Sequence, residues 1–292
     1  MTMQRKADFA LLLVTICWGV SYFLIDLCLE EMDPFTLNAW RFLVAFFVIA
    51  VLTFPRLRGV NRTTLKYAFF IGAILAVVYI CCTFGVRYTS QSNAGFLCVM
   101  NVLFTPIVVF FLRHEPPEKK IILVVILCVI GIGLMTLDDQ LHVGGGDLIC
   151  LLCAFSYTFD LLLTEHAVTL EEVDAYQLGV FQLLFTGLIV LALALIFETP
   201  CMPQSGVCWF GVIFLAIFCT GLPYIIQPIA QKYTTATHVG VIFCLEPIFA
   251  SVVAYFLAGE VLLPRAYLGA VLMLCGLLLM EIDLPPRING KK

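Results

Sequence analysis

The sequence predicts an all-α integral membrane protein: ten transmembrane helices arranged as two inverted five-helix repeats around a central cavity, with both termini in the cytoplasm. Three observations support this prediction. Of the 292 residues, 62% are hydrophobic and only 12% are charged. The apolar residues form runs long enough to cross a bilayer, separated by short polar loops. The second half of the chain also repeats the residue pattern of the first.

The apolar runs predict the helix boundaries. A chain this apolar cannot fold around one core with a water-facing surface. The hydrocarbon core of a bilayer is ~30 Å thick, so a helix crosses it with roughly 20 apolar residues. The runs lack the in-out alternation of a barrel wall, which favours helices over strands. The expected spans are residues 8–29, 34–54, 65–86, 91–112, 119–137, 146–166, 175–197, 206–229, 235–257 and 262–281.

Lysine and arginine predict the orientation, because cytoplasmic loops carry an excess of these residues. With the N-terminus in the cytoplasm, only Arg87 and Arg265 face the outside, and Arg41 lies within a span. Both termini are therefore expected in the cytoplasm. The cytoplasmic basic residues are then Arg5, Lys6, Arg56, Arg58, Arg62, Lys66, Arg113, Lys119, Lys120, Lys232, Arg287, Lys291 and Lys292.

The thirteen cysteines favour packing over a disulfide framework. Most lie inside the expected spans, where cysteine behaves as a small apolar side chain, and their number is odd. Cys201 and Cys208 could pair across one loop. Cys150 and Cys153 have the spacing of metal ligands, but no second ligand pair accompanies them, so packing is the favoured interpretation. We expect no metal and no cofactor.

An internal repeat organises the chain. A shift of 145 residues aligns RYTSQSNAGFLCVMNVLFTPIVVFFLRHE with KYTTATHVGVIFCLEPIFASVVAYFLAGE, and a shift of 139 aligns the first span with the sixth. Each copy has five helices, an odd number, so the second copy crosses in the opposite sense. Inverted repeats are typical of secondary transporters, whose substrate site lies near the midplane between them; duplication for packing alone is the alternative. The predicted domains are residues 1–137 and 146–281, with a cytoplasmic tail at 282–292.

Four features together resemble a known family. They are ICWGVSYFL in the first span, WRFLVA in the second, LEPIFASVVAYFLAGE in the ninth, and the double five-helix repeat. In these features the chain is similar to the drug/metabolite transporter superfamily, specifically its EamA-type ten-helix permeases. The resemblance implies a cytoplasmic-membrane permease, often an exporter of amino acids, metabolites or toxic compounds, with a central cavity lined by both repeats. The first repeat departs from the pattern, with Asn101-Val102 where the second has Glu246-Pro247.

Glu246 is the main candidate for function, because a charge in the middle of a span costs roughly 2.5–3.5 kcal/mol on insertion scales and normally faces protein or water. One hypothesis is that Glu246 takes up a proton or a cationic group on one side of the membrane and releases it on the other. The alternative is structural. Pro247 cannot donate to the carbonyl of Phe243, and a protonated carboxyl or a water could satisfy that carbonyl instead.

The repeat places further polar residues beside Glu246. Asn101 is its equivalent in the first half, and Asn93 is the equivalent of His238. Residues eight apart on a helix lie ~80° apart, so each half carries a polar stripe, and the two stripes are expected to face each other. His238 is then a candidate proton-coupling partner for Glu246, with a satisfied structural histidine as the alternative.

Asp160 in the sixth span is a second intramembrane acid. It shares a helix face with Tyr157, and we expect it in the cavity, as a site for the amine of a substrate or for proton coupling. A pair with Arg41 is the alternative. Arg41 could also neutralise Asp26, or both could extend to the interface.

Aromatic residues complete the predicted substrate site. Trp18 and Tyr22 are four apart on the first span, and Tyr79 and Tyr224 are repeat equivalents. They could form an aromatic wall that attracts an amine by cation–π interaction, although packing is an equal alternative. Prolines in GLPYIIQPIA are expected to break the eighth span around Tyr224 and Gln227, where exposed backbone could bind substrate.

Together these features predict a secondary active transporter, an exporter, that moves a small amine-bearing or amino-acid-like metabolite by alternating access, with proton coupling as a further hypothesis. A channel or uniporter-like facilitator is one alternative. An intramembrane enzyme is another: Gly144-Gly145-Gly146-Asp147 fits an aspartyl-protease motif, but its Tyr-Asp partner is absent, which favours a turn and helix cap. The expected partners are a small-molecule substrate and the lipid bilayer, not nucleic acid, and the chain is expected as a monomer or homodimer.

Overall fold

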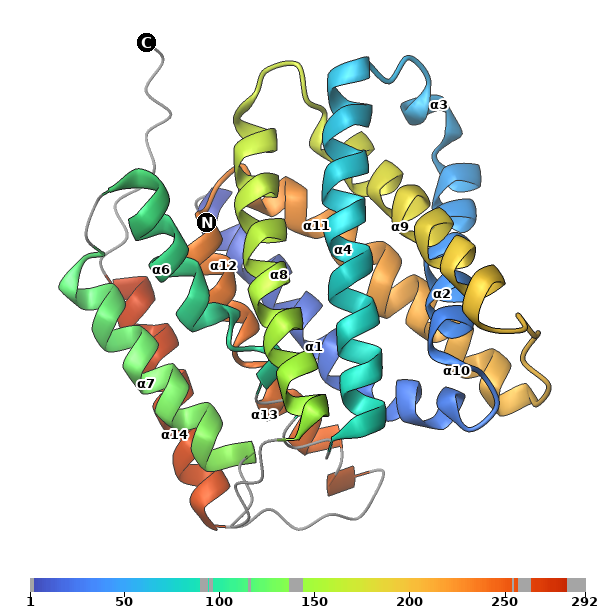
Figure 1. Cartoon of the computed structure of the whole chain (residues 1–292). Helices are drawn as coiled ribbons and strands as arrows, with labels where there is room; N and C mark the ends of the chain where they lie inside the picture. Colours follow the sequence, from blue (N-terminus) through green and yellow to red (C-terminus); the bar gives the residue numbers. More distant parts are fainter. Residues whose placement is uncertain are drawn as a thin grey trace.

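The computed structural model describes residues 3–89, 94, 97–114, 117–136, 144–253, 255–256 and 264–282. Over these ranges the chain is a bundle of α-helices without β-strands (Figure 1). Asn93 and most of the expected tail, residues 283–292, lie outside the described part. In the first half the helices are α1 (Met3–Leu29), α2 (Pro34–Leu52), α3 (Phe54–Leu57), α4 (Arg62–Tyr88), α6 (Asn101–Arg113) and α7 (Lys119–Thr136).

The second half repeats this order of helices, with two of its spans divided into shorter segments. Its elements are α8 (Gly145–Thr169), α9 (Ala175–Phe197), α10 (Gly206–Ala216), the π-helical segment η1 (Ile217–Gly221), α11 (Leu222–Gln231), α12 (Ala236–Phe243), α13 (Glu246–Val253) and α14 (Pro264–Ile282). Within the described ranges, seven helical segments are long and apolar enough to cross a membrane, and shorter apolar helices accompany them. The protein is therefore all-helical and multi-pass, while the count of ten crossings and the placement of the termini remain predictions.

Polar side chains at the helix ends explain where several helices begin. Asn61, Asp174, Ser205 and Thr235 each accept a hydrogen bond from the backbone N–H three residues later, at the starts of α4, α9, α10 and α12. Such caps satisfy amides that have no partner within the helix. At α8 the direction is reversed: Oδ2 of Asp147, in the first turn, accepts from the Gly144 N–H three residues earlier, at 2.8 Å. The expected turn and helix cap at this glycine run is thus confirmed.

Both halves interrupt a helix at the same repeat position. In the second half the interruption separates α12 from α13, which begins at Glu246, and in the first half α6 begins at Asn101, 145 residues earlier. The local hydrogen bonds also match. The Met100 amide donates to the Leu97 carbonyl at 3.3 Å, and the Leu245 amide donates to the Ile242 carbonyl at 3.2 Å. Since the first half has no proline at this position, the proline is not the sole cause of the interruption.

The eighth span, by contrast, does not break at Pro223 or Pro228, where the sequence predicted an interruption. Residues Gly206–Gln231 form one continuous helical span, because the π-turn η1 precedes Pro223 and the Leu222 amide donates to the Ile217 carbonyl, five residues back. Pro228 removes the donor that the Tyr224 carbonyl would otherwise use. Gln182 of α9 replaces that donor, with its Nε2 2.8 Å from the Tyr224 oxygen. The Tyr224 carbonyl, which was expected to be free for substrate, therefore already accepts a hydrogen bond.

Packing between the halves is reciprocal. Helices α7 and α14 lie side by side (Figure 1). A Cβ added to Gly131 on α7 would meet Met273 and Gly269 of α14. A Cβ on Gly276, its repeat equivalent, would meet Cys128 and Val124 of α7, which are the repeat equivalents of Met273 and Gly269. This exchange of contacts is what a twofold relation between two copies produces, and the small residues permit the close approach.

Loop contacts join segments that the topology expects on the same side of the membrane. At one end, the loop before α4 meets the loop before α9, where Asn61 Nδ2 donates to the Glu172 carbonyl and Thr63 Oγ1 to the Glu172 carboxylate at 2.9 Å. At the other end, the Glu198 carboxylate accepts from the Phe35 and Thr36 amides at 2.9 and 2.7 Å. Both loop contacts are consistent with a chain whose successive helices run in alternating directions across the membrane.

Candidate functional site

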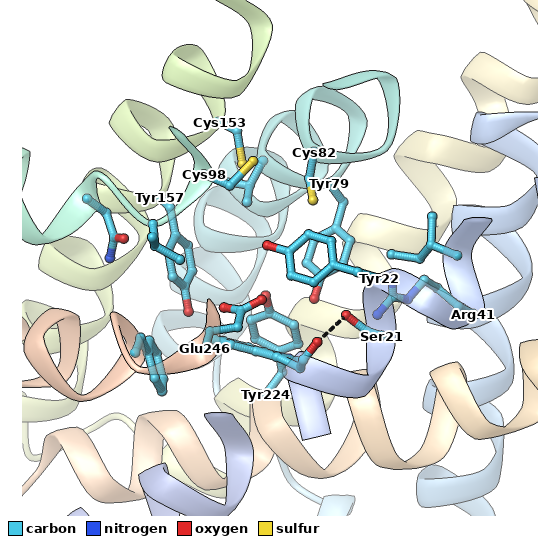
Figure 2. A pocket seen from close by; sticks show the side chains of 16 residues that line it. Ser21, Tyr22, Arg41, Tyr79, Cys82, Cys98, Cys153, Tyr157, Tyr224 and Glu246 are labelled. Atoms are coloured by element: carbon cyan, nitrogen blue, oxygen red, sulfur yellow. Dashed lines mark hydrogen bonds between the residues drawn. The ribbon is translucent and has the colours of Figure 1, made fainter. Parts of the chain in front are cut away.

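A cavity near the middle of the bundle collects most of the candidate residues. Its volume is about 60 Å³, which is room for a few water molecules and much less than the roughly 300–1,000 Å³ of typical ligand pockets. Side chains from both halves of the chain line it, as Figure 2 shows. Among the lining residues are seven predicted from the sequence: Trp18, Tyr22, Tyr79, Asn101, Tyr157, Tyr224 and Glu246.

Aromatic rings form a continuous wall of this cavity. Trp18 lies at the centre, with its ring centroid 4.6 Å from Phe243, 5.8 Å from Tyr224 and 6.1 Å from Tyr157. Tyr79 continues the wall, 5.8 Å from Tyr224. Trp18 Nε1 donates to the Cys219 carbonyl at 3.0 Å, so a hydrogen bond between α1 and η1 fixes the indole. The sequence did not single out Phe243, because one phenylalanine among 25 gives no signal.

Arg41 enters the cavity from α2 and does not reach the membrane interface. The side chain is buried, with 1% exposure. Its Nε donates to Thr220 Oγ1 at 2.8 Å and its Nη2 to the Cys219 carbonyl at 3.3 Å, while the guanidinium lies 4.6 Å from the centre of the Tyr79 ring. Nη1 is buried and makes no hydrogen bond within the described part of the chain. The expectation that Arg41 extends to the interface is therefore wrong.

Neither acid proposed as a partner of Arg41 pairs with it. Asp26 is exposed on α1, and no ion pair joins Arg41 to Asp26 or Asp160 among the residues that the structure describes. Hydrogen bonds to η1 take the place of an acid. Arg41 is thus a cation held by neutral groups, and its Nη1 amino group, which carries two N–H bonds, has no partner among the described residues.

Glu246 and Asn101 occupy equivalent places in the two halves. Each begins a helix and each lines the cavity. Asn101 Nδ2 is buried without a hydrogen-bond partner in the described structure. The carrier hypothesis for Glu246 and its structural alternative both remain predictions. Figure 2 shows Glu246 and Arg41 on different sides of Tyr22.

Asp160 and Gln227 lie behind the cavity wall and do not line it. Tyr157 joins them to the cavity, because its hydroxyl donates to Gln227 Oε1 at 3.1 Å. Gln227 Nε2 lies 3.2 Å from Asp160 Oδ2 and 3.3 Å from Gln231 Oε1. Asp160 is 1% exposed, and its Oδ1 has no hydrogen-bond partner among the described residues. These side chains form a buried polar chain that leads away from the cavity along α8 and α11.

His238 contacts an acid other than the expected one. Its Nε2 lies 3.1 Å from Oδ1 of Asp8 on α1, and it does not line the cavity. The contact joins α12 to the first helix of the opposite half. The expected direct partnership between His238 and Glu246 is therefore not present in this arrangement, and a role of His238 in proton coupling remains a prediction.

Three cysteines that the sequence suggested only as packing residues also line the cavity. They are Cys82 on α4, Cys98 just before α6, and Cys153 on α8. All thirteen cysteines are free thiols, so the suggested Cys201–Cys208 pair is not formed. Cys153 was noted for its spacing from Cys150, yet its neighbours in space come from other helices. No sequence spacing could have indicated that group.

These features define a multi-pass helical membrane protein with a central polar and aromatic cavity between two related halves. The chain belongs to the EamA-like transporter family, whose sequence profile matches residues 5–137 and again residues 144–282. A crystal structure of another protein shares the fold, with a TM-score of 0.79 at 15% sequence identity. The match covers 95% of this chain and 96% of the chain in that structure.

The similar proteins are named as transporters. A protein of Archaeoglobus fulgidus named "uncharacterized transporter" is 26% identical over 276 residues, covering 94% of this chain and 86% of its own. The Bacillus subtilis protein named "uncharacterized transporter YetK" is 26% identical over 83% of this chain and 76% of its own. YyaM of the same organism, also named "uncharacterized transporter", is 23% identical over 95% of this chain and 94% of its own length. This chain is accordingly a membrane transporter of the EamA family.

Proposed function

We propose that the chain is a secondary active transporter that exports a small zwitterionic metabolite, of the amino-acid type, across the cytoplasmic membrane by alternating access. The observation that carries the substrate class is the presence of Arg41 and Glu246 in one aromatic cavity. A carboxylate of the substrate would accept from Arg41 Nη1, which has no partner among the described residues. An amine of the substrate would meet the Glu246 carboxylate.

The cavity itself accounts for the preference for a solute that carries both charges. An isolated charge is costly in a site of low dielectric, whereas a zwitterion between an arginine and a glutamate completes two ion pairs at once. The faces of Trp18 and Tyr224 attract an ammonium group by cation–π interaction. The amine site expected at Asp160 is reassigned in this proposal to Glu246, since Asp160 does not line the cavity and, among the described residues, is joined to it through Gln227 and Tyr157.

Alternating access is supported by how the two halves contribute to the cavity. Residues of α1, α2 and α4 face residues of α8, α11 and α13 across it, and the family profile matches each half separately. The cavity of about 60 Å³ is smaller than an amino-acid-sized solute needs. In the proposal, rocking of the halves enlarges it toward one side and then the other, as in other inverted-repeat transporters.

Proton coupling is assigned to Glu246 and to the polar chain behind Tyr157. Glu246 is the acid that a substrate amine and a proton would compete for. Gln227, Asp160 and Gln231 continue from the cavity along buried hydrogen bonds. The proposal is that a proton enters Glu246 when the substrate leaves, so that the proton gradient drives export.

Transport by purified protein in proteoliposomes tests this function. The solutes should include a zwitterionic amino acid, the matching amine without a carboxylate, the matching acid without an amine, and an organic phosphate. We expect saturable uptake of the zwitterion, stimulated by a pH gradient, and counterflow when the lumen is preloaded. A response to anions alone contradicts the substrate class. Proton flux without added solute indicates a channel and contradicts alternating access.

A further inference from the structure

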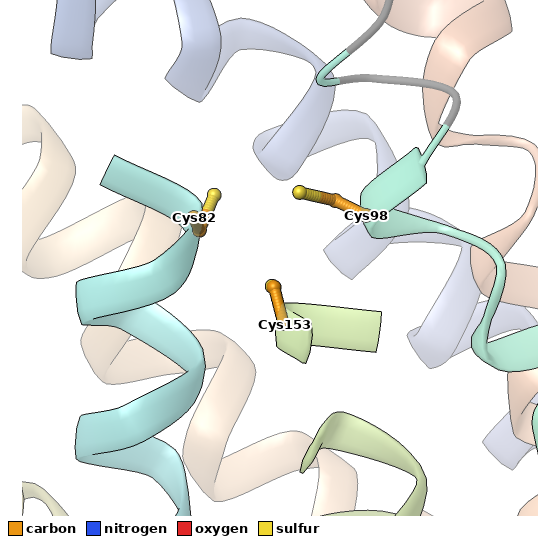
Figure 3. Close-up of side chains that lie close together, drawn as sticks. All are labelled: Cys82, Cys98 and Cys153. Carbon is orange, nitrogen blue, oxygen red and sulfur yellow. The ribbon is translucent and has the colours of Figure 1, made fainter. Parts of the chain in front are cut away.

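Three thiols meet at the cavity wall, although they are far apart in sequence. Cys82 belongs to α4, Cys98 to the segment before α6, and Cys153 to α8, and their sulfur atoms all lie within 4.8 Å of one another. Figure 3 shows the Cys82 and Cys98 side chains directed toward each other, with Cys153 on a third segment. Cys98 and Cys153 are buried, and Cys82 is partly exposed toward the cavity. We propose that this cluster binds a monovalent thiophilic metal ion of the Cu(I) class.

The distances suit metal coordination. A metal that binds each sulfur at ~2.3 Å in a trigonal plane holds the sulfur atoms about 4 Å apart. The observed separations of at most 4.8 Å therefore require the thiols to close by less than 1 Å. Rotation about one side-chain bond per cysteine can supply a movement of this size. Three ligands from three segments also restrict the geometry more than adjacent cysteines on one helix would.

The ligand set favours a soft monovalent ion. Thiolates select Cu(I), zinc and iron–sulfur clusters, but structural zinc is almost always bound by four ligands. The described cluster supplies three sulfur atoms, and a three-coordinate thiolate site matches Cu(I) better. Binding releases the thiol protons and involves no change of oxidation state. Arg41 lines the same cavity and offsets part of the negative charge that the metal–thiolate group would carry.

The position of the cluster gives the site a mechanical consequence. Cys82 and Cys98 belong to the first half of the chain and Cys153 to the second. A bound ion would therefore link the two halves at the cavity and hold them in the arrangement that brings the three thiols together. This inference does not depend on the proposed substrate, because metal binding can be measured in the absence of transport.

The test is a competition experiment with Cu(I) held by a chromophoric chelator, under anaerobic conditions, using the purified full-length protein in detergent. We expect the wild type to retain one more equivalent of Cu(I) than each of the variants Cys82→Ser, Cys98→Ser and Cys153→Ser. Loss of one of three ligands should weaken retention by at least about tenfold. Cys28→Ser, at a buried cysteine outside the cluster, and Cys275→Ser, at an exposed one, are the matched controls and should retain the wild-type amount.

A thermal melt provides the second readout and verifies folding. Cu(I) should raise the melting temperature of the wild type and of both controls but not of the three cluster variants, whose metal-free melting should stay close to that of the wild type. Equal Cu(I) retention by wild type and cluster variants overturns the site. Equal losses in the control variants do the same. If Zn(II) binds these thiols with the same stoichiometry and competes with Cu(I), the assignment to a monovalent ion is wrong.

Discussion

The Nε of Arg41 on α2 donates to Oγ1 of Thr220 on η1 at 2.8 Å, which joins the two halves of the chain beside the cavity. A second bond runs from Nη2 to the Cys219 carbonyl at 3.3 Å, so two of the three guanidinium nitrogens are held by η1. The π-turn that presents these groups is thus part of the site. Because two of its nitrogens are fixed, the guanidinium keeps a defined position in the cavity wall.

Replacing Arg41 with lysine should weaken substrate binding while the positive charge stays. An ammonium group cannot bond to Thr220 and the Cys219 carbonyl in this planar geometry and also reach a solute. A hydrogen bond to a charged group contributes ~1.5–3 kcal/mol, so KM for a zwitterion should rise roughly 10- to 100-fold. Initial uptake rates in proteoliposomes measure this. Arg62→Lys, at an exposed arginine of α4, should leave KM unchanged; equal effects of the two variants would contradict the role of Arg41.

Glu246→Gln should separate proton coupling from substrate exchange. Glutamine keeps the size of the side chain and removes its titration, so we expect loss of the stimulation by a pH gradient while counterflow persists. Uptake with and without the gradient, measured on the same vesicles, gives both quantities. The matched control is Glu171→Gln, the same change at an exposed position between α8 and α9. A Glu246→Gln protein with wild-type pH dependence would rule out Glu246 as the proton carrier.

Replacement by alanine should lower the free energy of unfolding more at Gly131 of α7 than at Gly276 of α14. A Cβ at Gly131 would lie 2.6 Å from Met273 Cγ and 2.7 Å from the Gly269 carbonyl oxygen, whereas at Gly276 the nearest atom is Cys128 Sγ at 3.1 Å. Overpacking costs ~1–3 kcal/mol, so Gly131→Ala should lower the free energy of unfolding by about this amount and Gly276→Ala by less. Reversible unfolding in detergent measures the difference.

Gly206→Ala is the control for the glycine pair, because a Cβ at that position would meet no other part of the described structure within 4 Å, apart from its chain neighbours and its own helix backbone. Its stability should equal that of the wild type or exceed it slightly. If Gly131→Ala is as stable as Gly206→Ala, the two helices are not packed as closely as the structure shows.

The helical architecture was predictable because long apolar runs leave few alternatives in a membrane. The span 175–197 coincides with α9 as observed. The residues around the cavity were predictable in part, since the repeat marked Asn101 with Glu246 and Tyr79 with Tyr224, and the structure brings all four together. A polar position that both halves share points to the interface between them.

The remaining features depend on tertiary contacts that no local pattern contains. Helices that are apolar on every side do not reveal which face is buried, so Arg41 could not be assigned to the cavity from hydropathy. No proline marks the interruption at Asn101 in the sequence. The prolines of the eighth span, in contrast, predicted a break that does not form, because η1 and Gln182 supply the hydrogen bonds that keep the span continuous. The Cys82–Cys98–Cys153 cluster exists only because three segments meet.

The hydrogen bonds of Glu31, beside the start of α10, should make the stability of the folded protein depend on pH. Its carboxylate accepts from the amides of Gln204 and Ser205 at 3.0 and 3.1 Å. Hydrogen bonding from the Ser205 side chain, and then from these amides, lowers the pKa of Glu31 below its ordinary value. The charged form is therefore favoured in the folded protein. Its contribution to stability is present above the unfolded-state pKa, ~4.3, and is lost as the pH falls through the lower folded-state pKa.

Glu31→Gln should remove this dependence. The melting temperature of the variant should lie below that of the wild type at pH 7, and the difference should shrink as the pH is lowered through the acid range, because the wild type loses its advantage when Glu31 is protonated. Thermal melts of both proteins across that range, in one detergent and at constant ionic strength, measure the effect. Glu30→Gln, at the exposed neighbouring position, is the matched control. A difference that stays constant with pH would mean that Glu31 acts through contacts that do not need its charge.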